Sequence, residues 1–373
     1  MNRPGPELPC VSRWILAFAC LAQAPGASAQ GVPSWQFGAD AQHTGRQDLR
    51  GPRATPSIVW RIRAAHRIAA SPALGASGTI AFVGVDGMVH VVDGFGVERS
   101  AWSSGHAVYA SPAARGASLL VAHDGGGLAA IDARGTPAWT VSTSHDVDAS
   151  PAVGTDGTVY IASRTVEAID TRGTVRWRTA VGSPVFGAPA LSVDGRLLYV
   201  ATMAGELFVL RSSDGSLERR LRVGASVHGG ALVLADGAVV LGAFDGHVRA
   251  WNPDGSLRWD VATRDGVRST PALGRDGTIV VGSDDGGIYG LRAHDGSTMF
   301  RAATHGRVRA SARIDADGWI YVGSEDDVLY ALDPSGTIAW TLALGADIDS
   351  SAVIPANGAL AVGCDDAGLY YLR

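Results

Sequence analysis

The sequence predicts an all-β protein, an eight-bladed β-propeller of four-stranded antiparallel blades that is closed by its N-terminal strand. One unit recurs eight times with a spacing of 38 to 42 residues, and its copies begin at Ser71, Ser111, Ser150, Ala188, Gly230, Thr270, Ser311 and Ser351. A period near 40 residues with several short strands per unit is typical of a propeller or a related array. The chain of 373 residues also contains 49 glycines, which suit many tight turns.

Composition narrows the possible functions. The formal net charge is −5 and no basic run is present, which argues against a nucleic-acid partner. All 31 basic residues counted as Lys or Arg are Arg, so Schiff-base and lysine-nucleophile chemistry are excluded.

Residues 1–29 are predicted to be a signal peptide. Arg3 and Arg13 give a positive start, residues 14–22 form an apolar run, and residues 27–29 (Ala-Ser-Ala) have the form of a cleavage site. The apolar run is shorter than the roughly 20 residues needed to span a bilayer. We therefore expect a periplasmic or secreted protein without a transmembrane segment after cleavage.

A lipid anchor at Cys20 is the less favoured alternative, because Phe18 is too bulky for the small-residue box that precedes a lipidated cysteine. After cleavage Cys364 alone remains, so no intramolecular disulfide is expected. We interpret Cys364 as a small apolar residue at a strand end.

Residues 30–57 form an extended lead-in, and residues 58–373 form the propeller. The lead-in is predicted to cap one face of the disc, with His43 as a hydrogen-bonding anchor. The last unit, from Ser351, has three strands before the chain stops, whereas residues 58–63 form a strand without the rest of a unit. This strand is therefore predicted to complete the eighth blade and to leave no large unpaired edge.

Within a unit such as residues 270–300, Pro271 stands at the start of the first strand, where its missing N–H is tolerated. An Asp-Gly pair such as Asp285-Gly286 predicts the hairpin between the second and third strands. The fourth strand has one aligned large residue in each unit: Trp60, Trp102, Trp139, Trp177, Arg219, Trp259, Phe300 and Trp340. One cofactor cannot stack on six equivalent indoles, so packing between adjacent blades is the favoured interpretation.

The lead-in pattern Trp-x-Phe-Gly-x-Asp-x-x-His-Thr-Gly-Arg over residues 35–46, followed by Ser-Pro-Ala repeats, resembles the pyrroloquinoline-quinone-like (PQQ-like) β-propeller repeat family. That family includes quinoprotein dehydrogenases and the propeller lipoprotein of the outer-membrane barrel assembly machinery. The resemblance covers about residues 35–373. In the dehydrogenases it implies adjacent cysteines, calcium and a catalytic Asp beside the quinone. This chain has no adjacent cysteines, and no Glu/Asn/Asp calcium set matches, so no cofactor is expected; PQQ with calcium belongs only to the alternative function.

Enzyme motifs are missing from the sequence: it has no Cys-x-x-Cys, His-Glu-x-x-His, Gly-x-Ser-x-Gly or phosphate-binding loop. The acidic pairs Asp284-Asp285, Asp326-Asp327 and Asp365-Asp366 recur at one hairpin, and Asp315-x-Asp317-Gly318 resembles part of a calcium loop. We interpret all of these as turn formers. No catalytic residue and no metal ligand is predicted.

The candidate binding site is a position that varies within a constant frame. Two residues before the start of each unit, and always after Ile or Val, stand Ala69, Tyr109, Asp148, Phe186, His228, Arg268, Arg309 and Asp349. We predict that these side chains, except Ala69, form a binding ring at the mouth of the central channel. The hairpins between the second and third strands are expected to add His123, Met203, Phe244, Glu325 and Asp365 on the same face.

Two interpretations of the ring remain open. Arg268 and Arg309, which we expect Asp148 and Asp349 to flank, either neutralise those carboxylates at a wet channel mouth or form a ligand site. As a site, the two arginines would suit a carboxylate or an acidic peptide.

The leading functional hypothesis is an exported, monomeric, non-catalytic binding or assembly scaffold. Its partner would be a protein of the cell envelope or a small acidic ligand. The alternative is a PQQ-dependent dehydrogenase or quinone-binding protein. A lectin-like sugar-binding propeller is a third hypothesis, which depends only on Tyr109 and Phe186.

Overall fold

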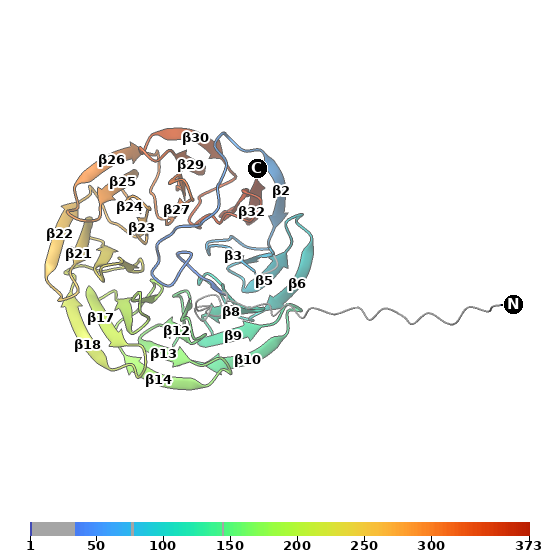
Figure 1. Ribbon diagram of the computed structural model, residues 1–373, viewed down its shortest axis with the longest axis horizontal. Helices are drawn as coiled ribbons and strands as arrows, with labels where there is room; N and C mark the ends of the chain where they lie inside the picture. The colour runs from blue at the N-terminus through green and yellow to red at the C-terminus, as the bar shows by residue number, and fades with distance from the viewer. Residues whose placement is uncertain (2–33, 76–77, 144) are drawn as a thin grey trace. The chain divides into compact units, whose positions relative to one another are not determined.

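Each repeat unit forms one antiparallel sheet, and eight such sheets surround a common axis (Figure 1). The computed structural model describes Met1 and residues 34–75, 78–143 and 145–373. The predicted signal peptide and Cys20 therefore lie outside the described residues. Among the described residues the regular structure is entirely β, which confirms the all-β eight-bladed propeller.

In blades 1 to 7 the strands run in sequence order from the axis to the outside, and those of blades 1 to 4 have the following bounds. Blade 1 contains β3 (Ala73–Leu74), β4 (Ile80–Val83), β5 (Met88–Val92) and β6 (Glu98–Ser103). Blade 2 contains β7 (Ala113–Arg115), β8 (Ser118–His123), β9 (Gly127–Ile131) and β10 (Pro137–Ser142). Blade 3 contains β11 (Ala152–Val153), β12 (Val159–Ala162), β13 (Thr165–Ile169) and β14 (Val175–Ala180). Blade 4 contains β15 (Ala190–Leu191), β16 (Leu197–Ala201), β17 (Glu206–Arg211) and β18 (Leu217–Arg222).

Blades 5 to 7 repeat this order. Blade 5 contains β19 (Leu232–Val233), β20 (Val239–Gly242), β21 (His247–Trp251) and β22 (Leu257–Ala262). Blade 6 contains β23 (Ala272–Leu273), β24 (Thr278–Gly282), β25 (Gly287–Arg292) and β26 (Thr298–Ala303). Blade 7 contains β27 (Arg313–Ile314), β28 (Ile320–Gly323), β29 (Val328–Leu332) and β30 (Ile338–Ala343).

The eighth blade joins the two parts of the chain, as predicted. Its outer strand β2 (Ile58–Arg63) pairs antiparallel with β32 (Gly368–Leu372), which pairs with β31 (Leu360–Gly363). The innermost strand is reduced to one bridge between Val353 and Ala361. The ring is thus closed by hydrogen bonds between segments about 300 residues apart in the chain, and no blade edge is left open at the seam.

Residues 34–57, which we call the strap, add a feature that the repeat pattern does not contain. The short strand β1 (Ser34–Trp35) pairs with β7, so blade 2 has five strands instead of the predicted four. The strap then crosses the centre of the ring (Figure 1). Its backbone carbonyls accept hydrogen bonds of 2.7–2.9 Å from the inner edges of blades 4 to 7: Ala41 from Leu191, Gln42 from Val233, Thr44 from Leu273 and Gly45 from Ile314.

Two glutamine side chains of the strap supply the remaining contacts. The amide of Gln36 bonds both backbone groups of Val153 in blade 3, at 2.7 and 3.2 Å. The amide of Gln47 bonds both backbone groups of Ile354 in blade 8, at 2.8 and 2.9 Å. The strap thereby satisfies exposed strand edges around most of the channel.

The aligned tryptophans lie on the outer strands, and four of the six bond the next blade, whereas Trp340 donates to Pro52 of the strap at 3.1 Å. The indole N–H groups donate to backbone carbonyls of the following blade at 2.9–3.2 Å: Trp60 to Gly94, Trp139 to Thr171, Trp177 to Ser212 and Trp259 to Ala293. Arg219, which replaces Trp in blade 4, donates to Pro253 of blade 5 at 2.7 Å. The apolar cores likewise lie between neighbouring sheets; one core joins Leu120 and Val141 of blade 2 to Ile161 of blade 3.

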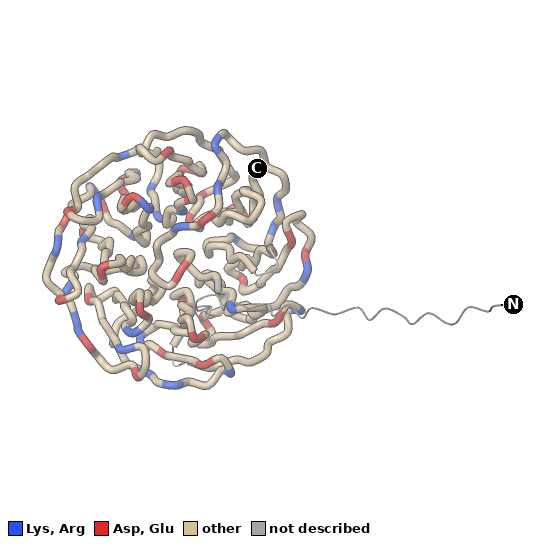
Figure 2. Tube along the Cα trace, in the orientation of Figure 1, with Lys and Arg blue, Asp and Glu red and all other residues tan. Residues whose placement is uncertain are grey.

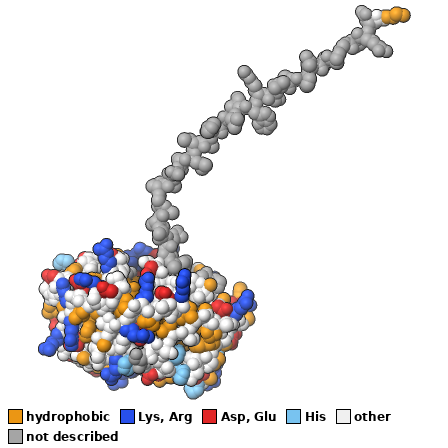
Figure 3. Space-filling view, turned by 90° about the horizontal axis from the view of Figure 1, so that it is seen from below, with side chains coloured by type: hydrophobic (Ala, Val, Ile, Leu, Met, Phe, Trp, Pro, Cys, Tyr) orange, Lys and Arg blue, Asp and Glu red, His pale blue; other side chains and the backbone are white. Residues whose placement is uncertain are grey.

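The outer surface carries both signs of charge around the ring (Figure 2). In the side view, arginines are interspersed with apolar side chains (Figure 3). In the part of the chain that the structure describes, no helix is long and apolar enough to cross a membrane. Cys364 is fully buried beside the β31–β32 turn, and burial raises the pKa of its thiol to about 11, as suits a small apolar residue.

Candidate functional site: a cup on the propeller axis

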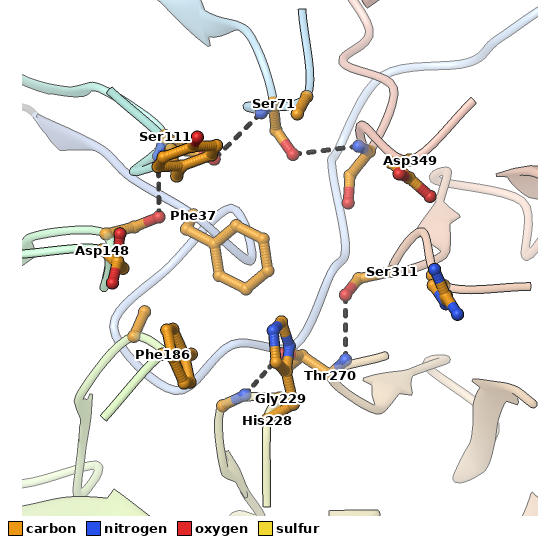
Figure 4. A pocket seen from close by; sticks show the side chains of 18 of the residues that line it. Phe37, Ser71, Ser111, Asp148, Phe186, His228, Gly229, Thr270, Ser311 and Asp349 are labelled. Carbon is orange, nitrogen blue, oxygen red and sulfur yellow. Dashed lines mark hydrogen bonds between the residues drawn. The ribbon is translucent and has the colours of Figure 1, made fainter. Parts of the chain in front are cut away.

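A cavity of about 640 Å³ lies where the eight blades meet, and we call it the cup (Figure 4). All seven residues predicted to form the ring line it: Tyr109, Asp148, Phe186, His228, Arg268, Arg309 and Asp349. Ala69 lines it at the eighth position. The constant frame explains this convergence, because the Ile or Val before each ring residue is buried between blades and directs its neighbour inward.

Below the ring residues, hydroxyl groups connect successive blades. A backbone N–H of one blade donates to the Ser or Thr hydroxyl of the next at 2.7–2.9 Å: Ser71 to Ser111, Ser111 to Ser150, Gly230 to Thr270, Thr270 to Ser311 and Ser351 to Ser71. Figure 4 shows these bonds around the cup, with Phe37 of the strap pointing into its centre. The Ser of Ser-Pro-Ala is therefore a connection between blades as well as a strand start.

Blades 4 and 5 have Ala188 and Gly230 in place of the hydroxyl residue, and His43 of the strap lies against Gly230. A Cβ atom on Gly230 would lie 3.0 Å from Nδ1 of His43, so a larger residue would displace the ring. Nδ1 donates to the carbonyl of Ala231 at 2.9 Å. Burial lowers the pKa of His43 to about 4, so the imidazole is neutral near pH 7 and acts as an anchor.

One side of the cup is aromatic. The rings of Phe186 and His228 stack with centroids 5.1 Å apart, and His228 stacks on Phe244 at 6.2 Å. The guanidinium carbon of Arg268 lies 4.5 Å from the centre of the Phe244 ring. Burial lowers the pKa of His228, and the charges of Arg268 and Arg309 lower it further, so this wall presents a neutral imidazole.

The arginines of the cup are bound to carboxylates of the protein itself. Nε of Arg268 lies 2.8 Å and Nε of Arg309 lies 3.2 Å from the two oxygens of Asp284. Arg309 also forms an ion pair with Glu325. Both arginines therefore already have a carboxylate partner within the protein, although that partner is neither Asp148 nor Asp349.

The neutralising partners differ from those expected. Asp148 lies between Tyr109 and Phe186 in blade order, and Figure 4 shows it across the cup from Asp349. The prediction that Asp148 flanks the arginines is wrong, because ring positions follow blade order and two of them, Phe186 and His228, lie between Asp148 and Arg268. Only Asp349 neighbours an arginine position.

Asp148 and Asp349 have unusual proton affinities. Burial, together with the neighbouring carboxylate of Asp124, raises the pKa of Asp148 to about 6. Burial and the carboxylates of Asp365 and Glu325 raise the pKa of Asp349 to about 6 as well. Near pH 7 both groups are mostly ionised, although their surroundings oppose the charge.

The hairpin residues predicted to share this face behave differently from one another. Phe244 and Glu325 contact ring residues directly. Asp365 holds Arg67 at 3.0 Å, and His123 stacks on His106 with centroids 5.3 Å apart. Of these hairpin residues, Phe244 and Glu325 therefore support ring side chains from behind, and Asp365 supports Arg67 of the cup.

The sequence did not identify four contributors to the cup: Phe37, Arg67, Asp124 and Asp284. Asp284 was interpreted as a turn former together with Asp285, but the two carboxylates have separate tasks. Asp285 accepts the N–H of Gly287 within the turn at 2.6 Å, whereas Asp284 turns to the arginines. The available signal was that the first residue of this hairpin varies between blades, as the ring position does.

Comparison with known proteins places the chain in a fold family. A family model described as outer membrane protein assembly factor BamB matches residues 124–193, 162–264 and 244–370. No curated protein matches the chain by sequence.

Solved structures with the same fold have several activities. BamB from Moraxella catarrhalis is 17% identical with a TM-score of 0.71, over 85% of this chain and 99% of that chain. Quinohemoprotein alcohol dehydrogenase from Comamonas testosteroni is 11% identical with a TM-score of 0.78, over 91% and 80%. The computationally designed Ika8 protein is 15% identical with a TM-score of 0.72, over 83% and 97%. At these identities the likeness establishes the fold alone.

The described residues do not fit PQQ with calcium. PQQ carries three carboxylates, but Arg268 and Arg309 already hold Asp284, and Arg67 holds Asp365. Within residues 34–75, 78–143 and 145–373, no three His, Cys, Asp or Glu side chains converge as metal ligands.

Proposed function

The chain belongs to the PQQ-like propeller family described as outer membrane protein assembly factor BamB, and on this premise we propose that it is an exported, non-catalytic binding scaffold. The cup and the rim around it would receive a protein partner in the cell envelope. Family membership supports a task in outer-membrane protein assembly, and the match over 99% of a BamB chain is consistent with it.

The observation that carries this proposal is the contrast between a fixed frame and a varied ring. Seven side chains of five residue types stand at equivalent places in the repeat, and all line one cavity. Selection for stability alone would favour similar residues at equivalent positions, as it does for the tryptophans. Tyr109 is 43% exposed at this rim, which suits contact with a macromolecule.

In-cell cross-linking tests the scaffold. A photo-reactive amino acid replaces Tyr109 at the cup rim or, as a matched control, Arg222 on the outer strand β18. We expect position 109 to give a cross-link to an outer-membrane assembly protein and position 222 to give none. Equal cross-linking from both positions, or no partner at position 109, would contradict the proposal.

A quinone-dependent dehydrogenase is the second candidate, because quinohemoprotein alcohol dehydrogenase has the same fold. Adding PQQ and Ca²⁺ to the purified protein tests it through bound chromophore and dye reduction. We expect neither. Stoichiometric uptake with turnover would replace the scaffold by the dehydrogenase.

A further inference from the structure

We propose that the cup binds a cationic group, a protonated amine or a guanidinium, between its carboxylate and aromatic walls. This inference rests on the proposed binding role of the same cup and specifies its ligand chemistry. It reverses the acidic ligand that the two ring arginines suggested in the sequence.

The side chains around the cavity carry more negative than positive charge. Arg67, Arg268 and Arg309 line the cup, and each is already in an ion pair with a carboxylate behind it, as described above. Three further carboxylates line the cup: Asp124, Asp148 and Asp349. Among the described residues none of these three lies within ion-pair distance of a basic side chain, so the wall has an excess of negative charge.

Two of these carboxylates have an oxygen atom that accepts no hydrogen bond within the described residues. Oδ1 of Asp124 and Oδ1 of Asp349 are buried and have no hydrogen-bond partner among the described residues. Buried polar atoms are normally satisfied, and unsatisfied ones in a native structure require an explanation. A bound ammonium or guanidinium would offset the cost of holding these charges together, because it supplies both positive charge and N–H donors.

Aromatic side chains line the same cavity. Phe37 at the centre, Phe186 stacked on His228 and Tyr109 at the mouth place aromatic rings around the same cavity as the carboxylates. An aromatic face attracts a cation by about 0.5–2 kcal/mol, whereas it offers nothing comparable to a carboxylate. The protein itself contains such a pair in this wall, Arg268 over Phe244. Aromatic and acidic surfaces that meet in one cavity are the combination that recognises organic cations.

Other titratable groups near the two key carboxylates do not reverse this charge. Asp146 and Asp124 face Asp148, and Asp365, Glu325 and Asp347 face Asp349; all are acidic. Arg309 is the basic group that acts on Asp349, and Arg67 feels the charge of Asp349 from the next blade. His123 stands next to Asp124, and burial and His106 lower its pKa, so it carries little charge near pH 7.

Calorimetric titration of the purified full chain with benzamidinium, and with benzoate as an anionic probe of similar shape, tests the inference. We expect benzamidinium to bind at pH 7.5 and benzoate not to bind. Binding of benzamidinium should weaken at least fivefold at pH 5, where Asp148 and Asp349 take up protons. Benzoate binding as tight as that of benzamidinium would overturn the inference.

The matched variants are Asp148→Asn with Asp349→Asn, which keep shape and remove charge, and Glu218→Gln, which removes an exposed carboxylate on β18. We expect the double variant to lose benzamidinium binding at least tenfold and Glu218→Gln to retain it. Retained binding in the double variant would refute the inference. A thermal melt of each variant separates loss of binding from loss of folding.

Two further probes distinguish the source of the cation. Agmatine represents a small free ligand, and a short Arg-containing peptide represents the side chain of a protein partner. Tighter binding of the peptide supports the partner, and equal binding supports a small ligand. If no cation binds while position 109 still gives the cross-link, this inference alone is refuted and the scaffold proposal is unaffected.

Discussion

The outer and inner positions of the same repeat unit follow different rules. On the outer strand, six of eight positions are Trp, and Arg219 makes the same inter-blade hydrogen bond where Trp is replaced. On the inner rim, no residue type is shared by more than two of the eight units. The backbone is equivalent in both places, so the difference arises from what each side chain faces: the next blade, or the cavity.

This contrast indicates which positions can vary in sequence without loss of stability. A side chain between blades must fill a defined space, and Gly215 in the turn beneath Trp177 leaves room for its indole. A side chain at the cup meets the cavity, its neighbours in the ring and the hairpins behind it. Stability should therefore depend strongly on the outer position and weakly on the inner one.

The largest expected effect is on Trp177, which bonds Ser212 at 2.9 Å and packs against the core between blades 3 and 4. Trp177→Ala should lower the free energy of unfolding by about 3–5 kcal/mol, because the lost ring leaves a cavity. Tyr109→Ala at the cup should change it by less than about 0.5 kcal/mol. Denaturant unfolding of both variants measures the two changes in unfolding free energy. Equal losses would contradict the predicted difference between the outer and inner positions.

A smaller effect is expected at the glycine beneath the ring. Gly215 has φ of +71°, and a Cβ atom there would lie 2.4 Å from Trp177, whereas Gly195 has φ of +70° with open space around it. Gly195→Ala should cost about 1 kcal/mol from the backbone alone. Gly215→Ala should cost roughly 2–3 kcal/mol, because the ring must also move. Thermal unfolding compares them, and matching losses would show that the indole contact does not matter.

The smallest expected effect is a gain in stability when Asp148 or Asp349 loses its charge. The pKa values of Asp148 and Asp349, about 6, lie above the usual Asp value near 4, so the folded state binds more protons than the unfolded state between these pH values. Their contribution to stability therefore falls as the pH rises from 4 to 6 and remains unfavourable above that. Each Asp→Asn change should stabilise the protein at pH 7.5 by roughly 1 kcal/mol, a figure reduced for partial solvation.

The difference in unfolding free energy between wild type and the double Asn variant, followed from pH 7.5 to pH 4, isolates these two groups from all others. It should shrink toward zero at low pH, where both carboxyl groups are protonated in either state. A difference that is constant with pH would show that ionisation is not its cause.

The sequence revealed the fold because eight imperfect copies average out local ambiguity, and it located the ring because Ile or Val marks the same place in each copy. The sequence did not predict the contacts made by segments that lie outside the repeat pattern. The strap has no period, so its glutamine contacts to Val153 and Ile354 could not be read from it. The partners of Arg268 and Arg309 come from hairpins, and only the three-dimensional register brings Asp284 between them.

One measurement addresses the central claim that the cup is shaped for binding at the expense of stability. Unfolding free energy and benzamidinium affinity are determined at pH 7.5 on the same preparation of the Asp148→Asn/Asp349→Asn variant. The account predicts higher stability with lost affinity. A variant that is less stable, or that still binds the cation as wild type does, would contradict it.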